Sequence, residues 1–322
     1  MKKLALLLAA LSVASVSYAK EVMPEAAPVV EEAPVVEQEV VEVKAAPVLR
    51  VTSVGQELVV ENKSNANDRG YEDVGDAIHL KNKVGLALGD SWTFDLMARK
   101  TWSASIDDNE VLATGEKTGS GMKSKAHRIE LAATRHFENF SLGLRWRGEK
   151  NQDAIFLPVT YNVGMVSGWF EPAYYFVNES KGQDYFYLEA EPVVLSYGPV
   201  QLAYYFEGYK WTGEGDGNAP EDTKSDYAHQ ARLRGTVYSN DAFSVGLEYR
   251  YQFAQDVEMV NGNKDVENNR HIGVLSGSYN VTENLTLAGY YQYEFNKYEQ
   301  HEGDVMDDDY YGEFGLGWTY NF

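Results

Sequence analysis

The 322-residue sequence contains no cysteine. This absence excludes disulfide bonds, thiolate metal sites and thiol chemistry. Basic residues are also scarce, since 28 Lys and Arg stand against 49 Asp and Glu, giving a formal net charge of -21. Nucleic-acid phosphates are bound by basic surfaces, so we expect no nucleic-acid partner.

No long apolar run occurs after residue 19, which excludes transmembrane helices from the rest of the chain. The first 19 residues have the pattern of a secretory signal peptide: Lys2 and Lys3, an apolar run over 4–16, and the small-residue cleavage pattern SYA at 17–19. We therefore expect residues 1–19 to be removed on export. No cysteine follows the run, so a lipoprotein anchor is excluded.

Residues 20–48 lack aromatic side chains and are rich in Pro, Glu and Val. Such a segment buries little surface, so we expect an acidic, extended periplasmic linker. The apolar repeats within PVVEEAPVVEQEVVEV leave a short coiled coil as the alternative.

The final stretch, 310–322, alternates with a period of two, which predicts a β-strand. One face carries Phe314, Leu316, Trp318, Tyr320 and Phe322. Aromatic residues at the last, third-last and fifth-last positions resemble the assembly signal of bacterial outer-membrane β-barrels. The resemblance implies that Trp318, Tyr320 and Phe322 are recognised by the barrel assembly machinery.

Similar alternating segments of about ten residues recur from residue 49 onward, which is the pattern of a transmembrane β-barrel. We expect an all-β, antiparallel up-and-down barrel of about 14 strands over 49–322. Tight turns are predicted at 89–91, 136–139, 164, 198–199, 239–241 and 280–284, and longer extracellular segments at 61–76, 103–123, 148–153, 178–184, 212–225, 254–268 and 296–308. A soluble all-β fold is the alternative, but its core would have to bury the whole aromatic face.

Two segments carry specific expectations about which face each residue occupies. In the segment 186–194, Phe186, Leu188, Ala190 and Val194 are predicted to face outward. In the segment 270–279 the outward face stays open, because Ile272 and Val274 compete with Leu275 and Tyr279.

Charged residues between the outward apolar positions are predicted to face the interior. A barrel of about 14 strands leaves room for water there. The predicted pore-lining residues are Arg99, Arg128, Arg145, Arg147, Arg232, Arg234, Arg250, Glu130, Glu171, Glu189, Glu207, Glu248 and Glu294, with Asp95, Glu191 and Glu313 on the same faces. We expect an arginine-bearing wall to face an acidic wall, as charged pores select ions in this way. The alternative is a set of solvated inner residues that pair locally.

No pattern indicates catalysis, a cofactor or a metal. The histidines, His79, His127, His136, His229, His271 and His301, show no metal-ligand spacing, and no GxSxG motif occurs. The acidic segments 304–309 and 256–267 do not match an EF-hand. We interpret them as solvated loops, with cation bridges to lipopolysaccharide as a hypothesis. A barrel enzyme that assembles His with Ser or Asp at strand ends remains a rival.

The mature start KEVMP at 20–24, the acidic Pro/Val segment, the Tyr-rich barrel and the terminal Phe322 resemble the fusobacterial major outer-membrane porins, the FomA-like family. The resemblance implies a 14-stranded, water-filled and weakly selective porin of the Gram-negative outer membrane, assembled as a homotrimer, whose loops also act as adhesins. The function expected is passive diffusion of small hydrophilic solutes and ions. The alternatives are an adhesin displayed on a barrel and an arginine-lined channel for acidic solutes.

Overall fold

The computed structural model describes residues 48–64, 74–103, 122–178, 183–213, 223–260, 262, 264–299 and 309–322. The described residues all belong to one compact unit, 47–322. The predicted signal peptide and nearly all of the predicted linker lie outside the described residues, so both stay predictions. The described unit is built from β-strands. Within it no helix is long and apolar enough to cross a membrane.

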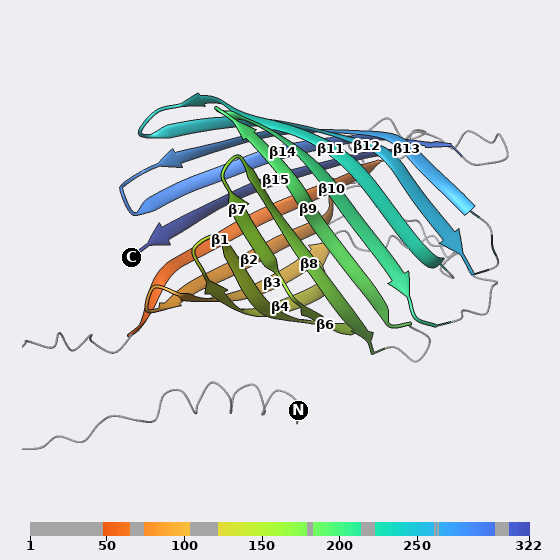
Figure 1. Cartoon of the computed structure of the whole chain (residues 1–322), viewed down its shortest axis with the longest axis horizontal. Coiled ribbons are helices and arrows are strands. Elements are labelled where there is room, and N and C mark those ends of the chain that lie inside the picture. Colours follow the sequence, from red (N-terminus) through yellow and green to blue (C-terminus); the bar gives the residue numbers. More distant parts are fainter. Residues whose placement is uncertain are drawn as a thin grey trace, which may run out of the picture. The chain divides into compact units, whose positions relative to one another are not determined.

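Fifteen strand segments follow one another along the chain (Figure 1). They are β1 (Leu49–Ser64), β2 (Val74–Leu88), β3 (Trp92–Ser103), β4 (Lys123–His136), β5 (Phe140–Glu149), β6 (Gln152–Phe156), β7 (Val159–Val163), β8 (Val166–Val177), β9 (Tyr185–Tyr197), β10 (Val200–Trp211), β11 (Thr223–Ser239), β12 (Phe243–Met259), β13 (Lys264–Asn280), β14 (Leu285–Glu299) and β15 (Asp309–Asn321).

Segments β6 and β7 are two parts of one strand position. Both pair with β5 on one side and with β8 on the other. The interruption falls at Leu157 and Pro158, where proline has no N–H to give to the ladder. The gap is bridged by the backbone, because Gly143 N donates to Pro158 O at 2.7 Å and Leu157 N donates to Pro172 O at 2.9 Å.

Every neighbouring pair of strands is antiparallel, and the sheet closes on itself. The first strand pairs with the last from Ser53↔Asn321 to Ser64↔Tyr310. The result is a closed barrel of 14 strands, which confirms the predicted fold class and strand number. Figure 1 shows the tilted strands surrounding a common interior. Closure leaves no sheet edge unpaired.

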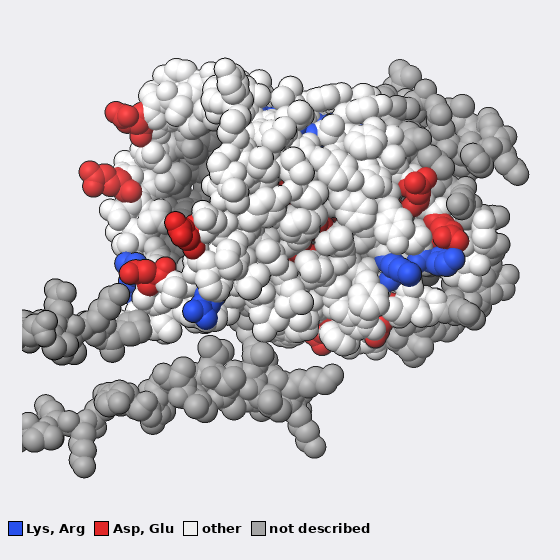
Figure 2. Space-filling view, in the orientation of Figure 1, with Lys and Arg blue, Asp and Glu red and all other residues white. Residues whose placement is uncertain are grey.

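The outer face is apolar, as the alternation predicted. On β15 the side chains of Phe314, Leu316, Trp318 and Tyr320 are all exposed. Figure 2 shows that the middle of the visible outer wall carries almost no charged side chains, which lie mostly toward its ends. An uncharged band around a closed sheet is the surface that a hydrocarbon layer requires.

One prediction of facing residues was wrong, on β9. A register shift between Tyr204 and Phe206 places both Glu191 and Pro192 opposite Tyr205. Such a β-bulge reverses the alternation beyond it. Val193 therefore faces outward, and Val194, predicted to face outward, is inside and only 3% exposed.

The structure also determines the face that the sequence left open on β13. Ile272 pairs with Arg250 and Val274 with Glu248, so these apolar residues share the face of charged ones. Ile272 is 2% exposed, whereas Leu275 is 52% exposed on the opposite face. The apolar residues of β13 thus divide between the interior and the outer wall.

The turns agree with the sequence better than the long segments do. The turns at Gly89, Gly164 and Gly198 each have a glycine at positive φ. However, two predicted long segments are short connections: β5 and β6 are joined by 150–151, and β12 and β13 by 260–263. The backbone pairing of β12 and β13 continues from Asp256↔Val266 to Glu258↔Lys264. Backbone hydrogen bonds do not require apolar side chains, so the two strands can extend beyond the apolar band of the outer wall.

Candidate functional site: the barrel interior

The predicted inward residues can be placed from pairs that reach over an intervening strand. Arg145 of β5 pairs with Glu171 of β8. Arg232 of β11 pairs with Glu191 of β9, and Arg250 of β12 donates to Gln292 of β14. Side chains from strands two apart converge only on the concave face of a curved sheet. These residues therefore face the interior; that they line a conducting path stays a prediction.

The first ion-pair cluster consists of Arg99, Arg128, Arg145, Arg147, Glu130, Glu149 and Glu171. Arg147 Nε donates to Glu130 Oε1 at 2.7 Å, and Arg128 pairs with Glu149. Antiparallel register brings these groups together, since Arg128 is opposite Glu149 and Glu130 is opposite Arg147. The cluster has four cationic groups and three carboxylates.

The first cluster is packed on an aromatic core inside the barrel. The guanidinium carbons of Arg145 and Arg147 lie 4.1 and 4.5 Å from the ring centroid of Phe156, which is 0% exposed. Phe156 packs edge-on to Tyr175, which accepts a 2.7 Å bond from Arg147 Nη1. This part of the interior is therefore filled with side chains.

The second ion-pair cluster consists of Arg232, Arg234, Arg250, Glu191 and Glu248. The carboxylate of Glu191 is shared: Oε1 accepts from Arg232 Nη1 at 3.0 Å, and Oε2 accepts from Arg234 Nη2 at 2.8 Å. Arg250 Nε donates to Glu248 Oε1 at 2.8 Å. Glu191 lies at the bulge of β9 and contacts both arginines of β11 from there.

A tyrosine–glutamate cluster lies between the two ion-pair clusters. Glu189 of β9 and Glu207 of β10 are opposite each other in the register. Tyr187, Tyr205 and Tyr209 donate hydroxyl hydrogen bonds to these carboxylates at 2.7 to 3.2 Å. In the described part of the chain neither carboxylate has an ion pair, so tyrosines solvate both charges.

Further interior pairs lie on the remaining strands. The predicted residue Glu294 is buried and pairs with Arg270. Lys81 and Lys83 pair with Glu57 at 3.4 and 2.9 Å.

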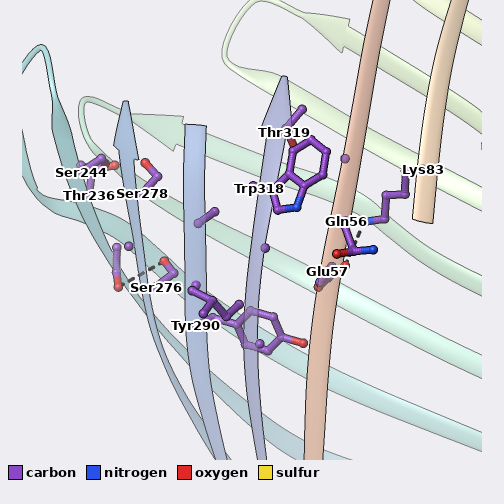
Figure 3. A pocket seen from close by; sticks show the side chains of 18 residues that line it. Gln56, Glu57, Lys83, Thr236, Ser244, Ser276, Ser278, Tyr290, Trp318 and Thr319 are labelled. Carbon is purple, nitrogen blue, oxygen red and sulfur yellow. Dashed lines mark hydrogen bonds and ion pairs between the residues drawn. The ribbon is translucent and has the colours of Figure 1, made fainter. Parts of the chain in front are cut away.

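Three connected cavities of about 710, 470 and 460 Å³ lie along the interior toward the short turns. The first two share Thr236, Gly246, Ser276 and Tyr290. The first and third share Gln201 and Arg234. Figure 3 shows the 470 Å³ cavity with small hydroxyl side chains of β11–β13 on one side, and Glu57 and Lys83 on the other. The interior thus has an open region along β11–β15 and β1, in contrast to the packed first cluster.

The predicted separation of an arginine wall from an acidic wall was largely wrong. Each arginine cluster contains its own carboxylates, because the antiparallel register places Glu and Arg of neighbouring strands opposite one another. Local pairing, the alternative reading, describes most of these contacts.

Glu149 and the inward tyrosines were not among the residues predicted to face the interior. Glu149 was placed in a loop, although it ends β5 and shares its face with Arg145 and Arg147. The tyrosines share the parity of charged residues, as in Tyr185, Tyr187 and Glu189 on β9. That parity was the available signal, but a tyrosine suits either face of a membrane barrel.

One histidine has the contacts of a hydrolase relay. His79 Nδ1 lies 2.8 Å from Thr101 Oγ1, and Nε2 lies 2.7 Å from Glu61 Oε1. Thr101 is buried, and no cavity described above is lined by it. A nucleophile needs access to its substrate, so we interpret this chain of bonds as structural. Among the described residues, no group of three or more His, Asp or Glu is arranged to hold a metal ion; His301 lies outside them.

Solved structures of outer-membrane proteins are similar to this chain at low sequence identity. OmpT, an outer membrane protein of Vibrio cholerae, is 11% identical, with a TM-score of 0.44 over 88% of this chain and 100% of that chain. The anion-selective porin from Comamonas acidovorans is 13% identical, with a TM-score of 0.40 over 85% and 100%. The outer membrane channel DcaP of Acinetobacter baumannii is 11% identical, with a TM-score of 0.40 over 87% and 98%. The sequence matches no family model and no curated protein. The function of this chain therefore rests on its own geometry.

Proposed function

We propose that the protein is an outer-membrane porin that passes small hydrophilic solutes and ions by passive diffusion. The observation that carries this proposal is a closed barrel with an apolar outer wall and connected polar cavities inside. In hydrocarbon every backbone polar group needs a partner, and a closed sheet provides one. The core of a soluble β-barrel is apolar, whereas the polar interior of this barrel suits water and solutes.

The solute path follows the open region rather than the middle of the barrel. The inner wall there is lined by small side chains, Thr236, Ser244, Gly246, Ser276 and Ser278. Small residues leave space that the arginines and aromatic rings of the first cluster occupy elsewhere. Of the predicted pore-lining residues, Arg232, Arg234, Arg250 and Glu248 line these cavities, and we assign them to the path.

The proposal extends to assembly and cellular location. We place the mature chain in the bacterial outer membrane after removal of residues 1–19, with residues 20–48 as a periplasmic linker. It would be a homotrimer of the FomA-like type, inserted by the barrel assembly machinery through Trp318, Tyr320 and Phe322, with lipopolysaccharide around its outer leaflet. These three aromatic side chains are exposed on the outer wall, where such recognition requires them. The proposal includes no enzymatic activity and no cofactor.

Single-channel current through refolded residues 20–322 in a planar bilayer tests the proposal. We expect stable ohmic steps, and the reversal potential in a salt gradient gives the sign of the ion preference. A folded barrel without current would overturn the porin proposal and favour an adhesin. A strong anion preference would favour the channel for acidic solutes.

Two single-cysteine variants locate the solute path. The wild-type sequence contains no cysteine, so each variant has one thiol. Ser276 lines both larger cavities, whereas Leu275 is exposed on the outer wall. A charged, water-soluble thiol reagent should reduce the current of Ser276→Cys in discrete steps and leave Leu275→Cys unchanged. The opposite pattern would show that the facing of β13 is inverted.

A further inference from the structure

A pair of amide side chains lies on the outer wall of the barrel. Gln56 of β1 and Asn82 of β2 are opposite each other in the register, and Gln56 Nε2 donates to Asn82 Oδ1 at 2.9 Å. The next residue on β1, Glu57, pairs with Lys81 and Lys83 in the interior. Because side chains alternate along a strand, Gln56 faces outward. Asn82 stands between these two lysines on β2 and faces outward as well.

The amide pair lies within the apolar band of the outer wall. The outward pairs of β1 and β2 on both sides of it are apolar: Val51↔Leu86 and Val54↔Val84 toward the short turn, and Leu58↔Leu80 and Val60↔Ile78 toward the other end. Leu58, next to the amides, is 41% exposed. The amides are therefore at the depth of the hydrocarbon and not at the rim of the barrel.

Much of the hydrogen-bonding capacity of the two amides is unused. A primary amide has two N–H donors and a carbonyl acceptor. Among the described residues, the 2.9 Å bond is the only hydrogen bond of either side chain. One N–H and the carbonyl oxygen of Gln56, and both N–H groups of Asn82, are left without a partner. Acyl chains neither donate nor accept hydrogen bonds, so exposure of these groups to lipid is unfavourable.

The residues beside the amides leave them accessible to a second molecule. Ala98 of β3 is opposite Asn82, and its methyl group is too short to cover the amide, which is exposed. Trp318 of β15 is opposite Gln56 and is 39% exposed. The surface thus combines polar groups at its centre with apolar side chains around them. In membranes, polar side chains of this kind join neighbouring protein segments by hydrogen bonds.

We propose that the outer wall of β1–β3 around Gln56 and Asn82 is the surface through which copies of this chain associate, and that it faces the symmetry axis of the homotrimer. The amides select a second copy as the partner, because the N–H groups of one primary amide match the carbonyl of another. Residues close to a symmetry axis lie close to their own copies, so the three amide pairs would meet there. This inference rests on the homotrimer of the proposed function and not on conduction.

Single-cysteine variants test which wall faces the axis, since the wild-type sequence contains no cysteine. Refolded residues 20–322 in lipid vesicles are treated with a short bismaleimide and separated by denaturing electrophoresis. We expect covalent dimers from Asn82→Cys and no covalent trimers, because one linker joins only two of the three thiols. Leu202→Cys is the matched control: this residue is 52% exposed on β10, on the far side of the ring of strands, and should stay monomeric.

Replacement of both amides by leucine tests whether they stabilise the trimer. One hydrogen bond between membrane-embedded side chains changes an equilibrium about threefold, so with three copies of the pair we expect the dissociation constant to rise about 10- to 30-fold in Gln56→Leu with Asn82→Leu. If the amides faced lipid, the same change would leave association unaltered. Analytical ultracentrifugation in detergent measures the constant. Tyr204→Phe removes a polar group from the outer wall of β10 and should leave it unchanged.

The outcomes separate this surface from the porin function. A trimer in which Asn82→Cys gives no dimers, or no more than Leu202→Cys, would overturn the surface, as would an unchanged dissociation constant in the double leucine variant. A monomeric wild type would overturn both the surface and the homotrimer. Should the double leucine variant fail to refold, the cysteine pair decides alone. Conduction is tested separately by the current of the wild type, because each barrel encloses its own cavities.

Discussion

Glu191 is the side chain on which the second ion-pair cluster depends. Its side chain is 3% exposed and binds two guanidiniums, at 3.0 Å to Arg232 and 2.8 Å to Arg234. Glu191→Gln keeps the size and one acceptor oxygen but removes the charge. Arg232 is then left beside Arg234 and opposite Arg250 in the register, without a counter-charge from β9.

The expected loss follows from the burial of the three partners. Breaking a fully buried pair by removing one partner costs about 3–5 kcal/mol. Arg234 faces the 710 Å³ cavity, where water solvates part of its charge, so the cost falls below that range. We expect Glu191→Gln to lower the free energy of unfolding by about 2–3 kcal/mol.

Urea unfolding of the refolded barrel in lipid vesicles, followed by tryptophan fluorescence, measures this change. Glu138→Gln in an exposed turn is the matched control and should change stability by less than about 0.5 kcal/mol. The double variant Glu191→Gln with Arg234→Gln should recover part of the loss, since it removes one stranded cation. A loss below about 0.5 kcal/mol in Glu191→Gln would contradict this role of Glu191, because it would mean that water, not Glu191, neutralises the arginines.

Three further predictions concern packing, facing and assembly. Gly315→Ala should destabilise the barrel by about 1–3 kcal/mol in the same urea assay, because its Cβ would lie 2.1 Å from the Tyr290 ring. Val193→Lys should cost about 1–3 kcal/mol, as a charge on the lipid face, whereas Ser196→Lys on the inner face should cost little. Phe322→Ala should lower the amount of barrel inserted in cells while leaving urea stability of the refolded protein nearly unchanged, since Phe322 is highly exposed.

Each of these has a result that would contradict it. Gly273→Ala, whose Cβ would meet nothing within 4 Å, is the control for Gly315→Ala, and equal losses would exclude a clash as the cause. Equal losses of stability for Val193→Lys and Ser196→Lys would contradict the opposite facing of these two residues, and with it the bulge at Glu191. A large loss of urea stability in Phe322→Ala would show that this residue stabilises the barrel directly.

The barrel could be predicted from the sequence because its alternation has a period of two over most strands. The parity of Arg145 and Arg147 placed both inside without any structure. Their partners could not be predicted in the same way, because contacts such as Arg145–Glu171 reach over a strand and depend on the register of three strands. Proline was an unused signal: Pro192 marks the bulge of β9, and Pro158 marks the gap between β6 and β7.

The interior site was harder to predict than the fold. Net charge at one place follows from how carboxylates are shared, as at Glu191, and this sharing is a property of three-dimensional contacts. Apolar residues inside, such as Phe156 and Ile272, also escape a rule that sends apolar residues to the lipid. Inside a barrel they support the charged groups instead.

The pairing of β1 with β15 has a consequence for the order of events in biosynthesis. Ser53, near the start of the barrel, pairs with Asn321 in the last strand, so a chain that lacks the last strand cannot close the barrel. Until the final strand arrives, β1 has one free edge, which invites pairing with other chains. Contacts between such distant parts of a sequence also form slowly. The whole polypeptide must therefore reach the membrane before it closes, and a premature stop before Asp309, which removes β15, would yield an open sheet rather than a smaller barrel.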